Sequence, residues 1–188
     1  MERNLVAYEE VYKLVQYIRK QWPKGDKMTP AVVEKRKFLY TLFYCAVGQT
    51  GTYVTPYQSV ASATLNKATL DHCFAPRLTF LAAMDQCPEK LAIREEVYKI
   101  IDFCRHTVKV TSYENGDMKY KFNPNGLPII RIRTADKYDR LGWIKTGVGL
   151  LQEKKGRKLV NSPFPLKHLI PDWFTAYEEK CMREHGYL

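Results

Sequence analysis

The spacing of apolar residues changes once along this chain, near residue 107, and this change limits the fold more than any other feature of the sequence. Before it, apolar side chains recur every three or four residues, which is typical of helices with one buried face. After it, residues 108–113 alternate between apolar and polar side chains, as half-buried strands do. The two periods in succession predict an α+β protein, with a helical N-terminal body ahead of a small sheet.

The N-terminal body carries clear signals for the starts of helices. Thr29 can accept a hydrogen bond from the first turn of a helix, and Pro30 suits the first helical position because it has no N–H to lose. Pro76 and Pro88 mark two further starts in the same way. Residues 48–58, rich in Gly, Thr, Tyr and Pro, predict a loop with short extended pieces. The expected helices cover residues 4–22, 29–48, 76–85 and 88–107.

A three-stranded antiparallel β-meander is predicted next, from residues 108–113, 118–122 and 129–133. The dipeptide Asn115-Gly116 is a strong signal for a two-residue hairpin turn between the first two strands. Residues 123–128 predict the second turn. A basic segment and a C-terminal helix over residues 166–184, interrupted near Pro171, complete the chain.

Charge gives the first indication of a partner. The chain has 30 Lys and Arg against 20 Asp and Glu, a formal net charge of +10. A balance this basic on a small protein favours a polyanionic partner, most often nucleic acid. Residues 131–158 alone hold nine basic residues against three acids. The 13 tyrosines can bond phosphate oxygens or stack on bases. The alternative is a solvated basic surface without a partner.

Ten basic residues are expected to contact DNA. Because side chains alternate across a strand, Lys119 and Lys121 should share one face of the second strand. Arg131 and Arg133 should share a face of the third, and a basic strand pair of this kind can lie against a phosphate backbone. The full set is Lys119, Lys121, Arg131, Arg133, Lys137, Lys145, Lys154, Lys155, Arg157 and Lys158.

The segment 70–77 resembles the opening of HNH-type nucleases, in which an Asp-His pair is followed by Pro and Arg. The resemblance implies that His72 acts as a general base on water and that Asp71 helps to hold a divalent metal such as Mg²⁺. Three residues separate His72 from Pro76, and no Asn or second His follows at the distance that the motif needs. The alternative is that Asp71 caps a helix that begins near Pro76.

A second segment, residues 137–147 followed by a basic run at 154–158, resembles the short DNA-binding elements appended to phage homing endonucleases. Glycines allow the backbone to approach phosphates, Trp143 can anchor the element in a small core, and the Lys and Arg residues release counterions. Together the two segments resemble a phage homing endonuclease whose nuclease chemistry is either active or lost.

The function expected from these observations is sequence-specific binding of double-stranded DNA by a protein of a phage or mobile element. Such a protein can act as a transcriptional repressor by occluding a promoter, and that role favours a symmetric homodimer. One alternative is a metal-dependent DNA endonuclease that uses Asp71 and His72. Another is a structural or protein-interaction factor without enzymatic activity. Residues 1–107 and 108–188 are expected as two parts that can pack as one unit.

The cellular setting is expected to be cytoplasmic. Five cysteines at wide, irregular spacing indicate reduced thiols rather than a disulfide framework. The chain has no apolar run of membrane-spanning length, and its first residues have the pattern of neither a signal nor a transit peptide. No Cys-x-x-Cys pair exists among the Cys and His residues, so no structural metal site is expected.

Overall fold

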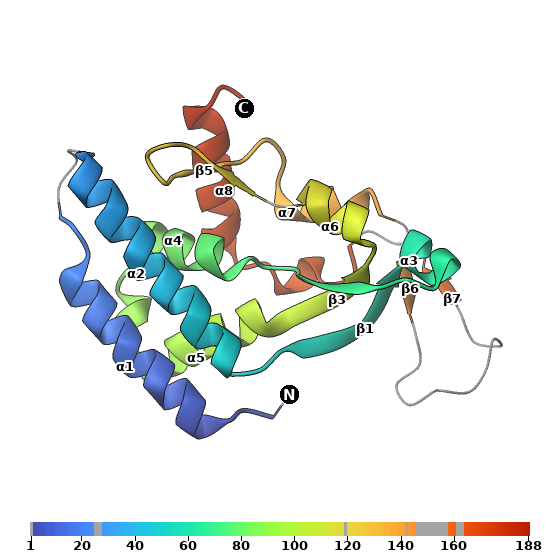
Figure 1. Cartoon of the computed structure of the whole chain (residues 1–188), viewed down its shortest axis with the longest axis horizontal. Coiled ribbons are helices and arrows are strands. Elements are labelled where there is room, and N and C mark those ends of the chain that lie inside the picture. The colour runs from blue at the N-terminus through green and yellow to red at the C-terminus, as the bar shows by residue number, and fades with distance from the viewer. Residues whose placement is uncertain (1, 25–27, 119, 142, 146–157, 161–163) are drawn as a thin grey trace.

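The computed structural model of the chain describes residues 2–24, 28–118, 120–141, 143–145, 158–160 and 164–188. It confirms an α+β protein, in which α1, α2, α4 and α5 gather at one end and a mixed sheet extends toward the other (Figure 1). The α-helices are α1 (Leu5–Gln21), α2 (Pro30–Gln49), α3 (Val60–Leu65), α4 (Pro76–Gln86), α5 (Arg94–Arg105), α6 (Ser112–Met118), α7 (Thr134–Asp139) and α8 (Asp172–Glu184). Short 3-10 turns are η1 (Lys90–Ala92) and η2 (Lys167–Leu169). None of the helices in these ranges has both the length and the apolar character needed to cross a membrane.

The predicted helix starts are largely confirmed. The side chain of Thr29 accepts a hydrogen bond from the backbone N–H of Val32, and Pro30 is the first residue of α2. Pro76 likewise begins α4. The helix predicted over residues 88–107 begins later, because η1 precedes α5. Local signals in the sequence therefore predict the starts of α2 and α4 correctly, but not the start of α5.

A five-stranded sheet forms with the order β2-β3-β1-β6-β7. Its strands are β1 (Tyr53–Ser59), β2 (Thr69–His72), β3 (His106–Val110), β6 (Trp143–Lys145) and β7 (Lys158–Val160). Strands β1 and β3 are parallel, and the other neighbouring pairs are antiparallel. The central strand β1 lies in the segment expected to be a loop. Pro56 weakens a strand prediction, and the register of β1 with β3 is irregular between Val54 and Gln58, where this proline lies.

The prediction of a first hairpin in the meander is wrong, because residues 112–118 form the helix α6. Thr111 and Glu114 make a capping box at its start. The backbone N–H of Glu114 donates to Thr111 Oγ1 at 3.1 Å, and the N–H of Thr111 donates to Glu114 Oε2 at 2.7 Å. These two hydrogen bonds satisfy N–H groups at the helix start, and Asn115 and Gly116 consequently lie within α6 rather than in a turn.

The second hairpin is confirmed in a shorter form. Strands β4 (Lys121–Phe122) and β5 (Pro128–Ile129) pair antiparallel, and Asn123 Oδ1 accepts a hydrogen bond from the N–H of Leu127 across the turn. The third strand ends before Arg131, and Arg133 is the N-cap residue of α7. Arg131 and Arg133 therefore do not share a strand face, contrary to the prediction.

One hydrophobic core contains residues of both parts of the chain expected from the sequence. Phe74, just after β2, stacks on Phe103 of α5 with 3.7 Å between ring centroids, and Phe174 of α8 packs against both rings edge-on. Trp143 of β6 is fully buried and contacts Phe164. This packing joins the segments next to the sheet to α5 and to the C-terminal helix α8.

Candidate nucleic-acid interface

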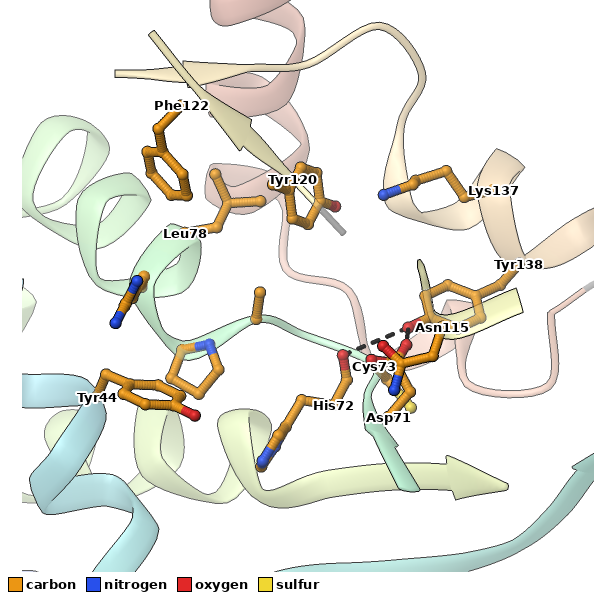
Figure 2. Close-up of a pocket in the computed structure, with 13 residues that line it drawn as sticks. Tyr44, Asp71, His72, Cys73, Leu78, Asn115, Tyr120, Phe122, Lys137 and Tyr138 are labelled. Atoms are coloured by element: carbon orange, nitrogen blue, oxygen red, sulfur yellow. Dashed lines mark hydrogen bonds between the residues drawn. The ribbon is translucent and has the colours of Figure 1, made fainter. Parts of the chain in front are cut away.

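A pocket of about 300 Å³ lies where the end of β2, the first turn of α4, α6 and α7 meet (Figure 2). This volume is at the lower end of the range of about 300–1,000 Å³ that is common for small-molecule sites. The wall combines aromatic rings with polar and charged side chains. Its lining residues are Tyr44, Asp71, His72, Cys73, Ala75, Pro76, Arg77, Leu78, Asn115, Tyr120, Phe122, Lys137 and Tyr138.

Asp71 is held in the pocket wall by Tyr138, which is 67 residues away in the chain. The Tyr138 hydroxyl donates to the Asp71 carboxylate and lies 3.3 Å from the carbonyl oxygen of His72. Burial raises the pKa of Tyr138, and the neighbouring Asp71 charge adds to this effect, so the hydroxyl remains a donor. The expectation that Asp71 caps α4 is wrong, since the N-cap residue is Ala75 and no side chain caps that helix.

His72 does not converge with Asp71. Neighbouring side chains of a strand point to opposite faces, and both residues belong to β2. The Nδ1–H of His72 donates to the carbonyl oxygen of Cys104 at 2.9 Å, and Figure 2 shows its imidazole turned away from the Asp71 carboxylate. Asn115, which the sequence placed in a hairpin turn, instead lies in α6 and lines the same pocket as Asp71.

The residues around Asp71 do not fit the divalent metal that the HNH resemblance implies. Of the described residues that line the pocket, Asp71 is the only carboxylate. Within the described ranges, no three His, Cys, Asp or Glu side chains are placed to hold an ion. Burial raises the pKa of the Cys104 thiol to about 12 and that of Cys73 well above its usual value, which keeps both thiols protonated. The endonuclease alternative therefore stays a prediction without a converging catalytic pair.

Lys137 of α7 connects this pocket to a second cavity. Its Nζ lies 3.9 Å from the centroid of the Tyr120 ring. Burial lowers the pKa of Lys137 to about 8, although the negative charges of Asp71 and Glu178 act in the opposite direction. At neutral pH the side chain is therefore cationic but incompletely hydrated.

The second cavity, of about 390 Å³, is lined by Gly116, Tyr120, Lys121, Ile129, Arg131, Ile132 and Lys137. We call it the basic groove. Lys121 and Arg131 are exposed, and the Arg131 guanidinium lies 5.5 Å from the centroid of the Tyr187 ring. The described residues of its lining include no Asp or Glu. Three of the ten cations predicted to contact DNA therefore lie together.

The other predicted cations are not brought into this groove by the described structure. Arg133 forms ion pairs with Asp136 at 2.8 Å and Glu179 at 3.4 Å, so nearby acids offset its charge. The backbones of Lys145 and Lys158 pair in register across β6 and β7. Lys119, Lys154, Lys155 and Arg157 lie outside the described residues.

Arg77 lines the pocket, and no separate role was predicted for it from the sequence. It follows Pro76 at the start of α4, and its guanidinium lies 4.9 Å from the centroid of the Tyr44 ring. No carboxylate in the described ranges forms an ion pair with it. The only signal in the sequence was its place in the segment that resembles HNH nucleases.

Glu178 of α8 does not line the pocket, but it bonds the pocket residue Tyr120 and the start of α7, and this role was not predicted from the sequence. It is 1% exposed and accepts hydrogen bonds from the Thr134 N–H at 2.9 Å, the Thr134 hydroxyl at 2.5 Å and the Tyr120 hydroxyl at 3.2 Å. These bonds tie α8 to the start of α7 and to Tyr120. A usable signal existed, because Glu178 lies four residues after Phe174 on the apolar face of its helix.

Comparison of the chain with family models, curated proteins and solved structures gives no match.

Proposed function

We propose that this protein binds double-stranded DNA through the basic groove. The observation that carries the proposal is the grouping of Lys121, Arg131 and Lys137 around one cavity with no acid among its described lining residues. Cations gathered at one cavity raise the local positive potential, although Asp71 and Glu178 offset part of the charge of Lys137, and contact with phosphates releases counterions. The net charge of +10 supports the same partner at the level of the whole chain.

The proposal extends to sequence-specific recognition, in a homing-endonuclease-like protein of a phage or mobile element that represses transcription by occluding a promoter. Phosphate contacts position a protein on DNA, whereas base contacts give specificity. Asn115 lines the pocket and its neighbour Gly116 lines the groove. An asparagine amide can pair with adenine through two hydrogen bonds, so Asn115 is the residue that we expect to contribute to base recognition.

The test is a salt titration of binding to a labelled duplex, followed by fluorescence anisotropy. The double variant Lys121→Gln/Arg131→Gln is compared with Lys13→Gln/Lys99→Gln, which removes the same charge from two lysines paired with glutamates on α1 and α5. Loss of two phosphate contacts should reduce the slope of log K against log salt by about 1.8. The control should keep the parental slope. Equal slopes for both double variants would remove the groove from the interface.

A further inference from the structure

The pocket beside the basic groove combines stacking surfaces, base-pairing groups and cations. We propose that it holds one unpaired nucleotide, taken out of the helical stack, while the phosphates of the same nucleic acid lie in the groove. This inference rests on the proposed function, and it names the part of the nucleic acid that the pocket recognises. Enclosure of a single base is the usual way in which a protein reaches the edge of a base that a duplex hides.

The aromatic side chains provide surfaces on which a base can stack. Tyr44 lines the pocket and is 42% exposed, and the guanidinium of Arg77 lies against its ring. Phe122 stacks on Tyr40 with ring centroids 5.8 Å apart, which fixes the orientation of that ring in the wall. Aromatic rings and guanidinium planes are the groups on which unpaired bases stack in nucleic-acid-binding proteins.

Polar groups for the edge of a base come from β2 and α6. Asp71 and Asn115 both line the pocket, and Figure 2 shows them on the same side, near Tyr138. The Tyr138 hydroxyl holds the Asp71 carboxylate in place. A carboxylate accepts from an exocyclic amino group, and an amide both donates and accepts, so the pair can bond the edge of a base that carries an amino group.

Cationic groups lie at two separate places in the wall. In Figure 2, Tyr44 and Lys137 are at opposite sides of the pocket. The guanidinium of Arg77, which also lines the pocket, lies 4.9 Å from the centroid of the Tyr44 ring. Lys137 also lines the basic groove. A nucleotide within a strand has a phosphate on each side of its sugar. The two cations therefore suit a nucleotide that remains part of a strand.

The volume agrees with a single occupant. About 300 Å³ is at the small end of the range of about 300–1,000 Å³ for small-molecule sites, which suits one nucleotide rather than a stretch of strand. The groove adjoins the pocket through Tyr120 and Lys137, which line both cavities. A strand in the groove can therefore deliver one of its nucleotides to the pocket.

The experiment compares affinities for three labelled probes at fixed salt: a fully paired duplex, the same duplex with one bulged adenosine, and the same duplex with a bulged abasic nucleotide. We expect the parent protein to bind the adenosine bulge about tenfold more tightly than the other two probes, because only this probe offers a base for stacking. Equal affinity for the adenosine and abasic bulges would overturn the inference, since recognition would then depend on the bend alone.

Variants separate this inference from the proposed function. Tyr44→Ala and, independently, Asn115→Ala should reduce the tenfold preference to about one. Tyr17→Ala, which removes an exposed tyrosine of α1, should keep it. Lys121→Gln/Arg131→Gln should weaken binding of all three probes and preserve the ratio. Salt-dependent binding without any preference would reject the pocket inference alone, and failure to bind any probe would reject both proposals.

Discussion

Burial changes the chemistry of the charged side chains that surround the pocket. Lys137 sits between Tyr120, Asp71 and Glu178, and burial lowers its pKa to about 8. Glu178 is almost completely buried, and desolvation raises the pKa of its carboxyl although several hydrogen-bond donors oppose that shift. Burial thus lowers the pKa of Lys137 and raises that of Glu178, so both groups titrate closer to neutral pH than an exposed lysine or glutamate does.

The pKa of Lys137 predicts a pH dependence of DNA binding. Protonated Lys137 attracts phosphate and the neutral amine does not, so affinity should fall as pH rises through about 8. Loss of this one contact is expected to weaken binding about three- to tenfold between about pH 7 and pH 9. Anisotropy titrations at constant ionic strength measure the effect. Lys137→Gln should bind more weakly at pH 7 and lack this step, and a step that persists in the variant would assign it to another group.

Glu178 is expected to contribute more to stability than to binding. Glu178→Ala removes the acceptor of the Thr134 N–H and of the Thr134 and Tyr120 hydroxyls, which then keep only the hydrogen bond between them, and this should lower the free energy of unfolding by about 2–4 kcal/mol. Glu178→Gln retains an acceptor oxygen and should cost about 1 kcal/mol or less. Urea denaturation followed by circular dichroism provides the measurement, and equal losses in both variants would show that the hydrogen bonds are not the cause.

The pH dependence of that stability has a definite sign. The pKa of Glu178 is higher in the folded than in the unfolded protein, so the folded state binds more protons in the window above the usual glutamate value. The free energy of unfolding should therefore decrease as pH rises through that window. Glu178→Gln has no titrating group at this position, and its denaturation curves should show a weaker dependence over the same range.

At the scale of single elements, α6 depends on a small set of hydrogen bonds at its start. Glu114 accepts from the Thr111 N–H and also from the Ser59 hydroxyl at 2.8 Å, which links α6 to the end of β1. Thr111→Val should lower the free energy of unfolding by about 1 kcal/mol through loss of the cap. The exposed neighbour Ser112 serves as the control, and Ser112→Ala should change the value by less than about 0.5 kcal/mol. Comparable losses in both variants would argue against the capping box.

The same element shows how far local sequence signals reach. Thr111 and Glu114 match the Thr-x-x-Glu pattern of a helix start, whereas Asn115-Gly116 matches a hairpin turn, and the two signals overlap. The cap prevails because its two hydrogen bonds form within one turn. Helix starts such as Thr29 were predictable for the same reason. The strand β1 was not, because its pairing depends on β3 and β6, which are distant in sequence.

Several residues of the candidate site were likewise predictable from the sequence, but the contacts between them were not. Sequence reasoning selected Asp71, Lys121, Arg131 and Lys137, because each belongs to a charged or motif-like segment. It did not predict that Asp71 and Lys137 line one pocket, because their proximity requires β2 to pair with β3 and α7 to fold back over these strands. Pairwise contacts between distant segments cannot be inferred from the spacing within either segment.

At the scale of the whole molecule, one core holds the α+β structure together. Phe74 is fully buried and contacts Phe103, Phe164 and Phe174, which lie on segments before and after residue 107. We expect a single cooperative unfolding transition, with coincident curves from tryptophan fluorescence and far-ultraviolet circular dichroism. Phe74→Ala should lower the free energy of unfolding by about 3–5 kcal/mol and shift both curves equally. Separate transitions would indicate that residues 1–107 and 108–188 unfold independently.

The shared position of Lys137 has a consequence for chemical intervention. Lys137 lines both the pocket and the basic groove. A compact anionic compound bound in the pocket would therefore neutralise part of the positive charge of the groove. Under the function proposed above, such a compound would compete with DNA without covering Lys121 or Arg131. Screening for inhibitors can therefore begin with fragments of nucleotide size rather than with mimics of an entire duplex.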